Sequence, residues 1–310
     1  MNYQTAHSCL TLLKQYHGSF SPTVSFVTPI QSVMLAAGAV SSQFQGLLGN
    51  VRFTPDAEQY ARTTGLKDAL DGKYRFPQRS GLEGTTYSKL ARLSTHAEVD
   101  RCNEVIGDVI HHQLAKASPK AVQEFSKVVG ELHDNVASHA RGTGFSSVQC
   151  YDDANGTRIE FAVADAGCGM LRNVKSKVST VDNDLKAIEW CLVRGNTTAS
   201  GGEDEWEQWL PEDALSNPYP PSVKVRAVED HHCGEGLWKL QQLIQSWNGS
   251  LWISSGQGCI LHDGSTRRDW MTDLSWQGVA IEFSIRVHEA CEAEKPEHSA
   301  IEELGRRLGL

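Results

Sequence analysis

The 310-residue sequence lacks the features that mark several large classes of protein. No apolar run approaches the roughly 20 residues that a membrane-spanning helix needs. The opening stretch, MNYQTAHSCL, has no basic start followed by an apolar run, so it does not predict a secretory signal. We therefore expect a cytoplasmic protein with no membrane segment.

Paired cysteines are also missing. The eight cysteines are scattered singly and form no CxxC pair. This spacing disfavours a zinc ribbon and a disulfide framework, and it predicts free, mostly buried thiols. The stretch HHCGEG, residues 231–236, places His beside Cys, but such neighbours do not readily form a tetrahedral zinc site without further spaced ligands.

No block of Lys and Arg is present. The chain carries 29 Lys and Arg against 38 Asp and Glu, for a net charge of -9. Proteins that bind duplex nucleic acid usually concentrate basic residues on one face, so nucleic-acid binding is disfavoured. The remaining composition is that of an ordinary globular protein, and at roughly 100–200 residues per domain the length predicts two domains.

Strand and helix signals alternate in the first part of the chain. The β-branched run VSFVTP, from residue 24, predicts a strand, and helical periodicity follows it. NVRFTP and AEQYARTTGLKDAL predict a second strand and a second helix. We predict a small α/β regulatory or partner-binding domain over residues 1–95, a main domain over 96–290 and a tail over 291–310.

The main domain has a different order of elements. Two helices are predicted over 98–117 and 120–140, followed by a β-hairpin with its tight turn at Asn155-Gly156. A long irregular interval precedes a helix at 236–247, and the last predicted strands are NGSLWISSG and GVAIEFSIRV. This order predicts an α+β fold, a two-layer sandwich with a mixed, antiparallel-rich sheet and helices on one face.

One helical stretch, ELHDNVASHA, spaces Glu131, Asn135 and His139 four residues apart. Positions four apart lie on one face of an α-helix. A partly exposed polar face would give the same pattern, so this stretch alone does not decide between an ordinary surface and a site.

Two glycine-rich stretches lie at the ends of other predicted elements. DAGCGM begins with Asp165 at the end of a strand and continues with Gly167 and Gly169, whereas CGEGLWKL places Gly234 and Gly236 at the start of a helix. Each pair alone could be an ordinary turn. Their order along the chain, together with the polar helix, is more specific.

These residue types suit a nucleotide with a bound metal ion. A buried carboxylate can accept a hydrogen bond from the exocyclic amine of adenine, and glycines let the backbone approach the ligand closely. The start of a helix favours phosphate. An Asn oxygen can bind magnesium, and a Glu one turn away could take a proton from an attacking nucleophile.

The combination resembles the GHKL, or Bergerat-fold, ATPases, which include the histidine-kinase catalytic domain, DNA gyrase and the anti-sigma-factor serine kinases. ELHDNVASHA resembles their N box, DAGCGM the first glycine box and GEGL the second. GNTT, residues 195–198, resembles a stretch that often precedes the second box. The resemblance covers about residues 100–288.

The resemblance implies ATP and Mg²⁺ as ligands, with Glu131 as the general base, Asn135 as the magnesium ligand and Asp165 on the adenine amine. The residues that it places around the nucleotide are Asn135, Asp165, Gly167, Gly169, Met170, Thr197, Gly234, Gly236 and Leu237.

Two departures from the family pattern stand out. Val279 follows Gly278 where many relatives carry a Thr that helps to bind adenine, which implies weaker affinity. In addition, the interval that forms a lid in the family, here about residues 171–233, is long and includes an acidic, Pro-bearing stretch. This stretch could be a partner-binding or regulatory element, or only a surface loop.

Two functions remain open. One is an ATP hydrolase or a protein kinase of the serine/threonine type in a regulatory system, closest in character to the anti-sigma-factor kinases. The other is an ATP-dependent conformational switch with little turnover. HHQLAKASPK lacks the acidic residue and Arg that accompany a phospho-accepting His, so we do not expect a self-contained histidine kinase. We expect a protein partner and allow for a homodimer.

Overall fold

The computed structural model describes residues 23–41, 51–75, 81–115, 118–140, 142–196 and 236–293. Its strands are β1 (Thr23–Val24), β2 (Arg52–Phe53), β3 (Ala91–Leu93), β4 (Gly144–Asp153), β5 (Gly156–Asp165), β6 (Ser250–Asp263) and β7 (Thr266–Arg286). Its α-helices are α2 (Pro29–Val40), α3 (Pro55–Thr63), α4 (Leu66–Leu70), α5 (His96–Leu114), α6 (Pro119–Asn135), α7 (Gly169–Lys175), α8 (Asp184–Cys191), α9 (Gly236–Ser246) and α10 (Val287–Ala293). A π-helix, η2 (Val136–Ala140), follows α6.

The main sheet contains five strands in the order β3-β4-β5-β7-β6. Every neighbouring pair is antiparallel. The prediction of an α+β fold is confirmed, whereas the prediction that this sheet is mixed is wrong. Within the described ranges, the strands that pair in parallel are β1 and β2, which form a separate small sheet. Short hairpin turns join β4 to β5 and β6 to β7, and such turns produce antiparallel neighbours.

The first predicted hairpin is confirmed, with its turn one residue earlier than expected. Asp153 pairs with Gly156, so Ala154 and Asn155 form the turn. Gly156 has φ 94°, a left-handed conformation that glycine adopts without a steric penalty. The second hairpin is much longer than the sequence indicated, because β6 and β7 continue through residues 257–277, for which no strand was predicted.

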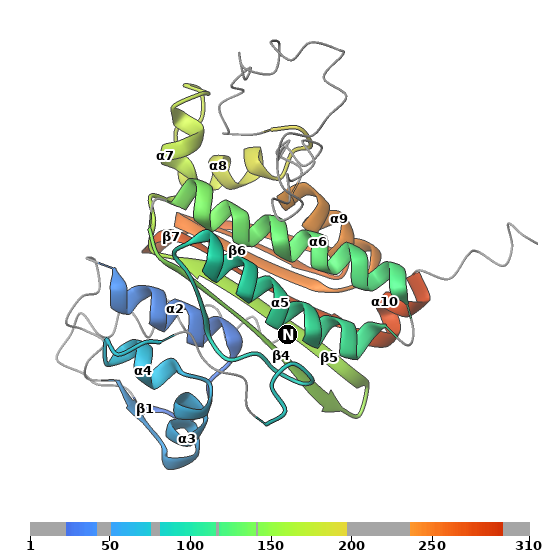
Figure 1. Ribbon diagram of the computed structural model, residues 1–310. Helices are drawn as coiled ribbons and strands as arrows, with labels where there is room; N and C mark the ends of the chain where they lie inside the picture. Colours follow the sequence, from blue (N-terminus) through green and yellow to red (C-terminus); the bar gives the residue numbers. More distant parts are fainter. Residues whose placement is uncertain are drawn as a thin grey trace, which may run out of the picture.

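One face of the main sheet is covered by helices α5, α6 and α9, and Figure 1 shows α5 and α6 lying side by side across it. Alternate residues of β5, such as Ile159, Phe161 and Val163, point into this core. The N-caps Thr95 and Ser118 accept hydrogen bonds from backbone N–H groups in the first turns of α5 and α6. These caps explain where both helices begin.

The described helices of the predicted main domain share one core, as predicted, and the opposite face of the sheet is covered by α2 from the first part of the chain. All residues from Pro29 to Gly38 are buried, as expected for a helix that is apolar all round. Phe145, Ala162 and Ala164 belong to the same buried cluster as α2. Ala162 and Ala164, at alternate positions near the end of β5, are therefore buried under α2, and this part of the sheet lies between two helical layers.

The elements that precede the main sheet follow the predicted strand-helix-strand order, with one difference. The helix predicted over residues 57–70 is divided into α3 and α4 at Gly65, whose φ is 84°. These elements share a buried core with the second face of the main sheet. The division of the chain at residue 95 stays a prediction.

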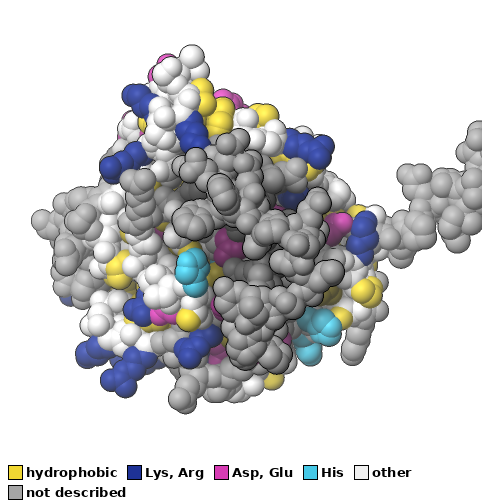
Figure 2. Space-filling view, turned by 45° about the horizontal axis from the view of Figure 1, so that its top comes forward, with side chains coloured by type: hydrophobic (Ala, Val, Ile, Leu, Met, Phe, Trp, Pro, Cys, Tyr) yellow, Lys and Arg dark blue, Asp and Glu magenta, His cyan; other side chains and the backbone are white. Residues whose placement is uncertain are grey.

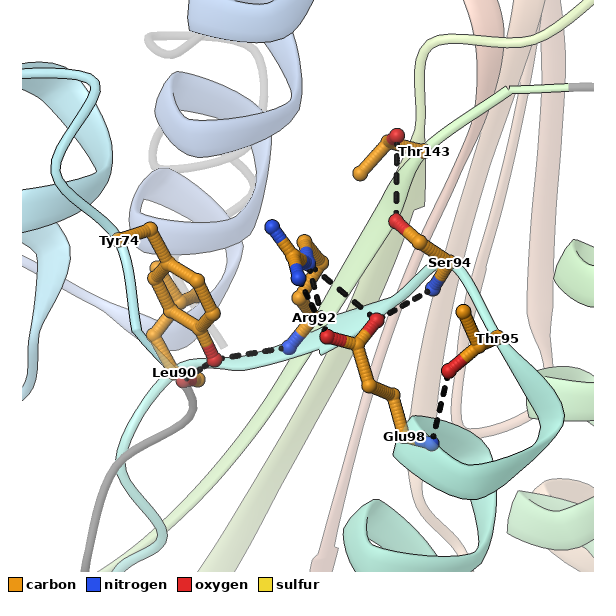
Figure 3. Close-up of polar contacts among 7 residues, drawn as sticks. All are labelled: Tyr74, Leu90, Arg92, Ser94, Thr95, Glu98 and Thr143. Carbon is orange, nitrogen blue, oxygen red and sulfur yellow. Dashed lines mark hydrogen bonds and ion pairs between the residues drawn. The ribbon is translucent and has the colours of Figure 1, made fainter.

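A network of polar contacts joins this first part of the chain to β3 and α5 (Figure 3). The Tyr74 hydroxyl donates to the Leu90 carbonyl at 2.8 Å and accepts from the Arg92 N–H at 3.0 Å. The Arg92 guanidinium pairs with the Glu98 carboxylate, which also accepts from the Ser94 N–H at 3.1 Å. These contacts fix the start of α5 relative to the sheet.

No helix in the described ranges combines the length and the apolar character that a bilayer span requires.

Candidate functional site

The end of α6 and the start of α9 come together at three of the predicted site residues. A methyl group on Gly236 would lie 2.7 Å from Oε2 of Glu131 and 3.7 Å from Nδ2 of Asn135. Because Gly236 has no side chain, the first turn of α9 can approach these side chains closely. The two stretches that resemble the N box and the second glycine box, about 100 residues apart in sequence, are therefore adjacent.

Helix α6 separates its polar and apolar side chains as the sequence predicted. Glu131 and Asn135 are half-buried, whereas Leu132 and His133 between them are fully enclosed by the core. The α-helix ends at Asn135 and the π-helix η2 begins at the next residue. Because a π-helix has a different repeat from an α-helix, the four-residue stripe expected to reach His139 does not continue in α-helical form.

Asp165 lies at the end of β5, as predicted, and its carboxylate is held by the backbone. Oδ1 accepts from the Gly167 N–H at 2.7 Å and Oδ2 accepts from the Val279 N–H at 3.2 Å. The side chain is buried, and this burial raises its pKa to about 6 although both N–H groups oppose the shift. A buried carboxyl with a fixed orientation can recognise a ligand donor.

Gly278 is a site residue that the sequence analysis did not assign to the site. A methyl group on Gly278 would lie 2.1 Å from the backbone oxygen of Asp165 and 2.4 Å from its Oδ1. β7 therefore approaches Asp165 closely only because residue 278 is glycine. A glycine inside a strand pattern was the available signal, since it often marks a close approach of backbones.

The loop after β5 packs against the end of η2. The Cys168 N–H donates to the Ala140 carbonyl at 2.9 Å, and a methyl group on Gly167 would lie 2.0 Å from the same oxygen. Asn135 directly precedes η2, and the loop after Asp165 contacts the last residue of η2. The two predicted site residues are therefore connected through this π-helix. π-Helical turns frequently occur at functional sites.

Gly169 and Met170 connect the same loop to the long hairpin. Gly169 has φ 71°, and a methyl group on it would lie 3.1 Å from Oγ of Ser255 in β6. The Met170 N–H donates to this hydroxyl at 2.9 Å. Asp165, Gly167, Gly169 and Met170 therefore lie in one continuous segment that is packed against β6 and the end of η2.

Of the remaining predicted site residues, one lies in the described part of the chain and two lie outside it. Leu237 is partly buried against the main core, behind Gly236. Thr197 and Gly234 lie outside the described residues, as does most of the acidic part of the predicted lid. The described part of that interval forms α7 and α8, which Figure 1 shows beyond one end of α6.

Two basic residues that the sequence analysis did not assign to the site flank the start of α9. Nζ of Lys239 lies 3.6 Å from Oε1 of Glu131. The guanidinium carbon of Arg194 lies 5.0 Å from the centre of the Trp238 ring, within the range of a cation–π contact. Lys239 lies one helical turn after Gly236, so its position could have been inferred from the helix periodicity.

The charge around the site bears on anion binding. Figure 2 shows Asp and Glu side chains near the centre of the face turned forward there, with most Lys and Arg side chains toward its margin. A highly charged anion on such a surface needs nearby cations.

Among the described residues, no group of three or more His, Cys, Asp or Glu side chains is arranged to bind a metal ion.

Asn135 has suitable chemistry for the predicted magnesium site, because its amide oxygen is the kind of hard ligand that Mg²⁺ binds. Magnesium at nucleotide sites is usually held by one or two protein ligands, with substrate phosphates and water completing its shell. The position of Asn135 beside the start of α9 fits this arrangement. Its role as a ligand stays a prediction.

Comparisons of the chain with protein-family models, curated proteins and solved structures found no significant match.

Proposed function

We propose that the chain binds Mg-ATP in the manner of the GHKL ATPases and acts as an ATP hydrolase or a serine/threonine-type protein kinase in a regulatory system. The observation that carries this proposal is the position of Gly236 against Glu131 and Asn135. It brings a candidate base, a candidate metal ligand and the start of a helix within contact distance. A triphosphate can interact with all three.

The chemistry requires only one proton acceptor from the protein. Glu131 takes the proton from a water molecule or from a hydroxyl of a protein partner. The oxygen of that nucleophile forms a bond to the γ-phosphorus, the bond from the γ-phosphorus to the bridging oxygen breaks, and ADP leaves with the electron pair. Magnesium, when bound, neutralises phosphate charge, and positioning supplies most of the remaining rate enhancement.

Asp165 supports recognition of adenine in this proposal. Each of its carboxylate oxygens accepts one backbone N–H bond and retains capacity to accept another. The backbone N–H of Val279 helps to orient the Asp165 carboxylate. The side chain of Val279 has no hydroxyl group that could form a further hydrogen bond to the ligand. We therefore expect adenine to be recognised through Asp165 with modest affinity.

The test is a calorimetric titration with ATP and Mg²⁺, combined with an assay of ADP release. We expect wild-type protein to bind, Asp165→Asn to bind much more weakly, and Glu131→Ala to bind ATP without releasing ADP. Equal ATP affinity in wild type and Asp165→Asn, in proteins with the same circular dichroism spectrum, would overturn the proposal.

The switch function remains the second candidate, because the Glu131 carboxylate is engaged by Lys239 rather than free. In that case ATP would change the surface presented to a protein partner, with little hydrolysis. Binding of ATP without turnover in wild-type protein, with or without a hydroxyl-bearing partner, would favour the switch over the kinase.

A further inference from the structure

The carboxylate of Glu131 lies beside the start of α9, the helix end to which the proposed function assigns a phosphate. Its Oε2 atom approaches the first residue of α9 so closely that a methyl group on Gly236 would be 2.7 Å away. The first turn of an 11-residue helix carries backbone N–H groups without partners in the helix and the positive end of its dipole. A carboxylate there is stabilised in the same way as a bound anion.

Lys239 reinforces this arrangement from within α9. Its ammonium group lies 3.6 Å from Oε1 of Glu131, and both side chains are largely shielded from solvent, with exposures of 30% for Lys239 and 18% for Glu131. A partly buried pair is screened less by salt than an exposed pair. The guanidinium of Arg194, over the Trp238 ring, adds a second cation at the same turn.

We propose that Glu131 occupies the anion position at the start of α9 and that Lys239 exchanges this carboxylate for a phosphate when a polyphosphate binds. The inference rests on the proposed nucleotide site. In the unliganded protein, Lys239 holds the carboxylate away from a nucleophile. The phosphate then forms the ion pair with Lys239 and binds at the start of α9, and Glu131 becomes able to accept a proton. Lys239 is thus a positioning residue for Glu131.

The exchange predicts that removing the negative charge of Glu131 strengthens the binding of a polyphosphate. Glu131→Gln keeps the size of the side chain but removes the anion that competes with phosphate. We expect Glu131→Gln to bind inorganic tripolyphosphate about three- to tenfold more tightly than wild type, because a charge at a helix terminus contributes energies of this order. Lys239→Met should bind it more weakly. In the double variant, the gain from Glu131→Gln should shrink.

A matched pair on the same helix provides the control. Glu124 on α6 forms an ion pair with Lys120 at the same distance of 3.6 Å, but both side chains are much more exposed. Glu124→Gln and Lys120→Met change the net charge of the protein by the same amounts as the test variants. They should leave tripolyphosphate affinity within about a factor of two of wild type, because exposed pairs interact weakly.

The experiment is isothermal titration calorimetry of the full chain with tripolyphosphate and, separately, with Mg-ATP. Unchanged or weaker tripolyphosphate binding by Glu131→Gln, or unchanged binding by Lys239→Met, overturns the exchange. ATP binding that depends on Asp165 without any gain in Glu131→Gln overturns the exchange alone. Absence of binding of either ligand to every variant overturns both the exchange and the proposed function.

Discussion

The Glu131 side chain lies against Gly236 at the start of α9, where a methyl group would be 2.7 Å from Oε2 and 3.2 Å from the β-carbon of Glu131. Glu131 belongs to a helix that packs on the main sheet, and Gly236 begins a helix more than 100 residues later. This contact joins two sequence motifs that were predicted separately.

Gly236→Ala should impair both stability and nucleotide binding. The added methyl group must displace the flexible end of Glu131 and would lie 3.2 Å from its β-carbon, so we expect a cost of about 1 kcal/mol in unfolding free energy, the lower end for overpacking. Gly130→Ala is the matched control, because Gly130 is adjacent to Glu131 but has open space at its β-carbon position. In a helix interior this control should be neutral or stabilising by up to about 1 kcal/mol. Urea denaturation and ATP titration measure both effects, and equal behaviour of the two variants would contradict the prediction.

Gly278→Ala should be more severe than Gly236→Ala. Its methyl group would lie 2.1 Å from a backbone oxygen of Asp165, and a strand backbone in the middle of a sheet cannot move aside as a side chain can. We expect a loss of at least about 3 kcal/mol in unfolding free energy, toward the upper end for strained core substitutions. Gly107→Ala on α5, where the β-carbon position is open, should retain wild-type stability or exceed it. Thermal unfolding monitored by circular dichroism makes the comparison.

The stability contributed by Asp165 should fall as the pH rises. Burial raises its pKa in the folded protein to about 6, well above the ordinary value of an aspartate, so the group favours folding most below about pH 4 and loses this contribution as the pH passes through 6. Relative to Asp165→Asn, wild-type protein should lose up to about 3 kcal/mol between pH 4 and pH 7. Urea unfolding at several pH values measures the difference, and a difference that does not vary with pH would contradict this assignment.

His133 should have the opposite pH dependence. It is fully buried, with Nδ1 2.6 Å from Oδ1 of Asn103 and Nε2 2.8 Å from Oγ of Ser146. Burial lowers its pKa to about 3, far below the ordinary value of a histidine, so its contribution is present above about pH 6.5 and is lost as the pH falls toward 3. His133→Gln should be less stable than wild type at pH 7, because Asn103 or Ser146 loses a partner. The gap between the two proteins should narrow steadily at pH 6, 5 and 4.

The helix that carries Glu131 and Asn135, the β4–β5 hairpin and the strand that ends at Asp165 were all predictable from local patterns. Helical spacing, an Asn-Gly turn and alternating apolar residues are properties of a few neighbouring residues. The long β6–β7 hairpin was missed, although Trp270, Leu274 and Trp276 alternate with exposed residues in its outer part and were the available signal. Local patterns could mark Gly278 and Lys239 as candidates, but their contacts with Asp165 and Glu131, which are distant in sequence, come only from the tertiary structure.

By itself, the sequence determined α6, the β4–β5 hairpin and α9, because capping, periodicity and turn residues act over a few positions, whereas α7 and α8 lie in an interval that it predicted to be irregular. The tertiary structure decided that α2 covers the second face of the sheet, that η2 follows Asn135, and that Gly236 and Lys239 meet Glu131. These outcomes depend on how apolar faces pack together. Packing brings distant residues within contact distance, and local sequence contains no information about those distances.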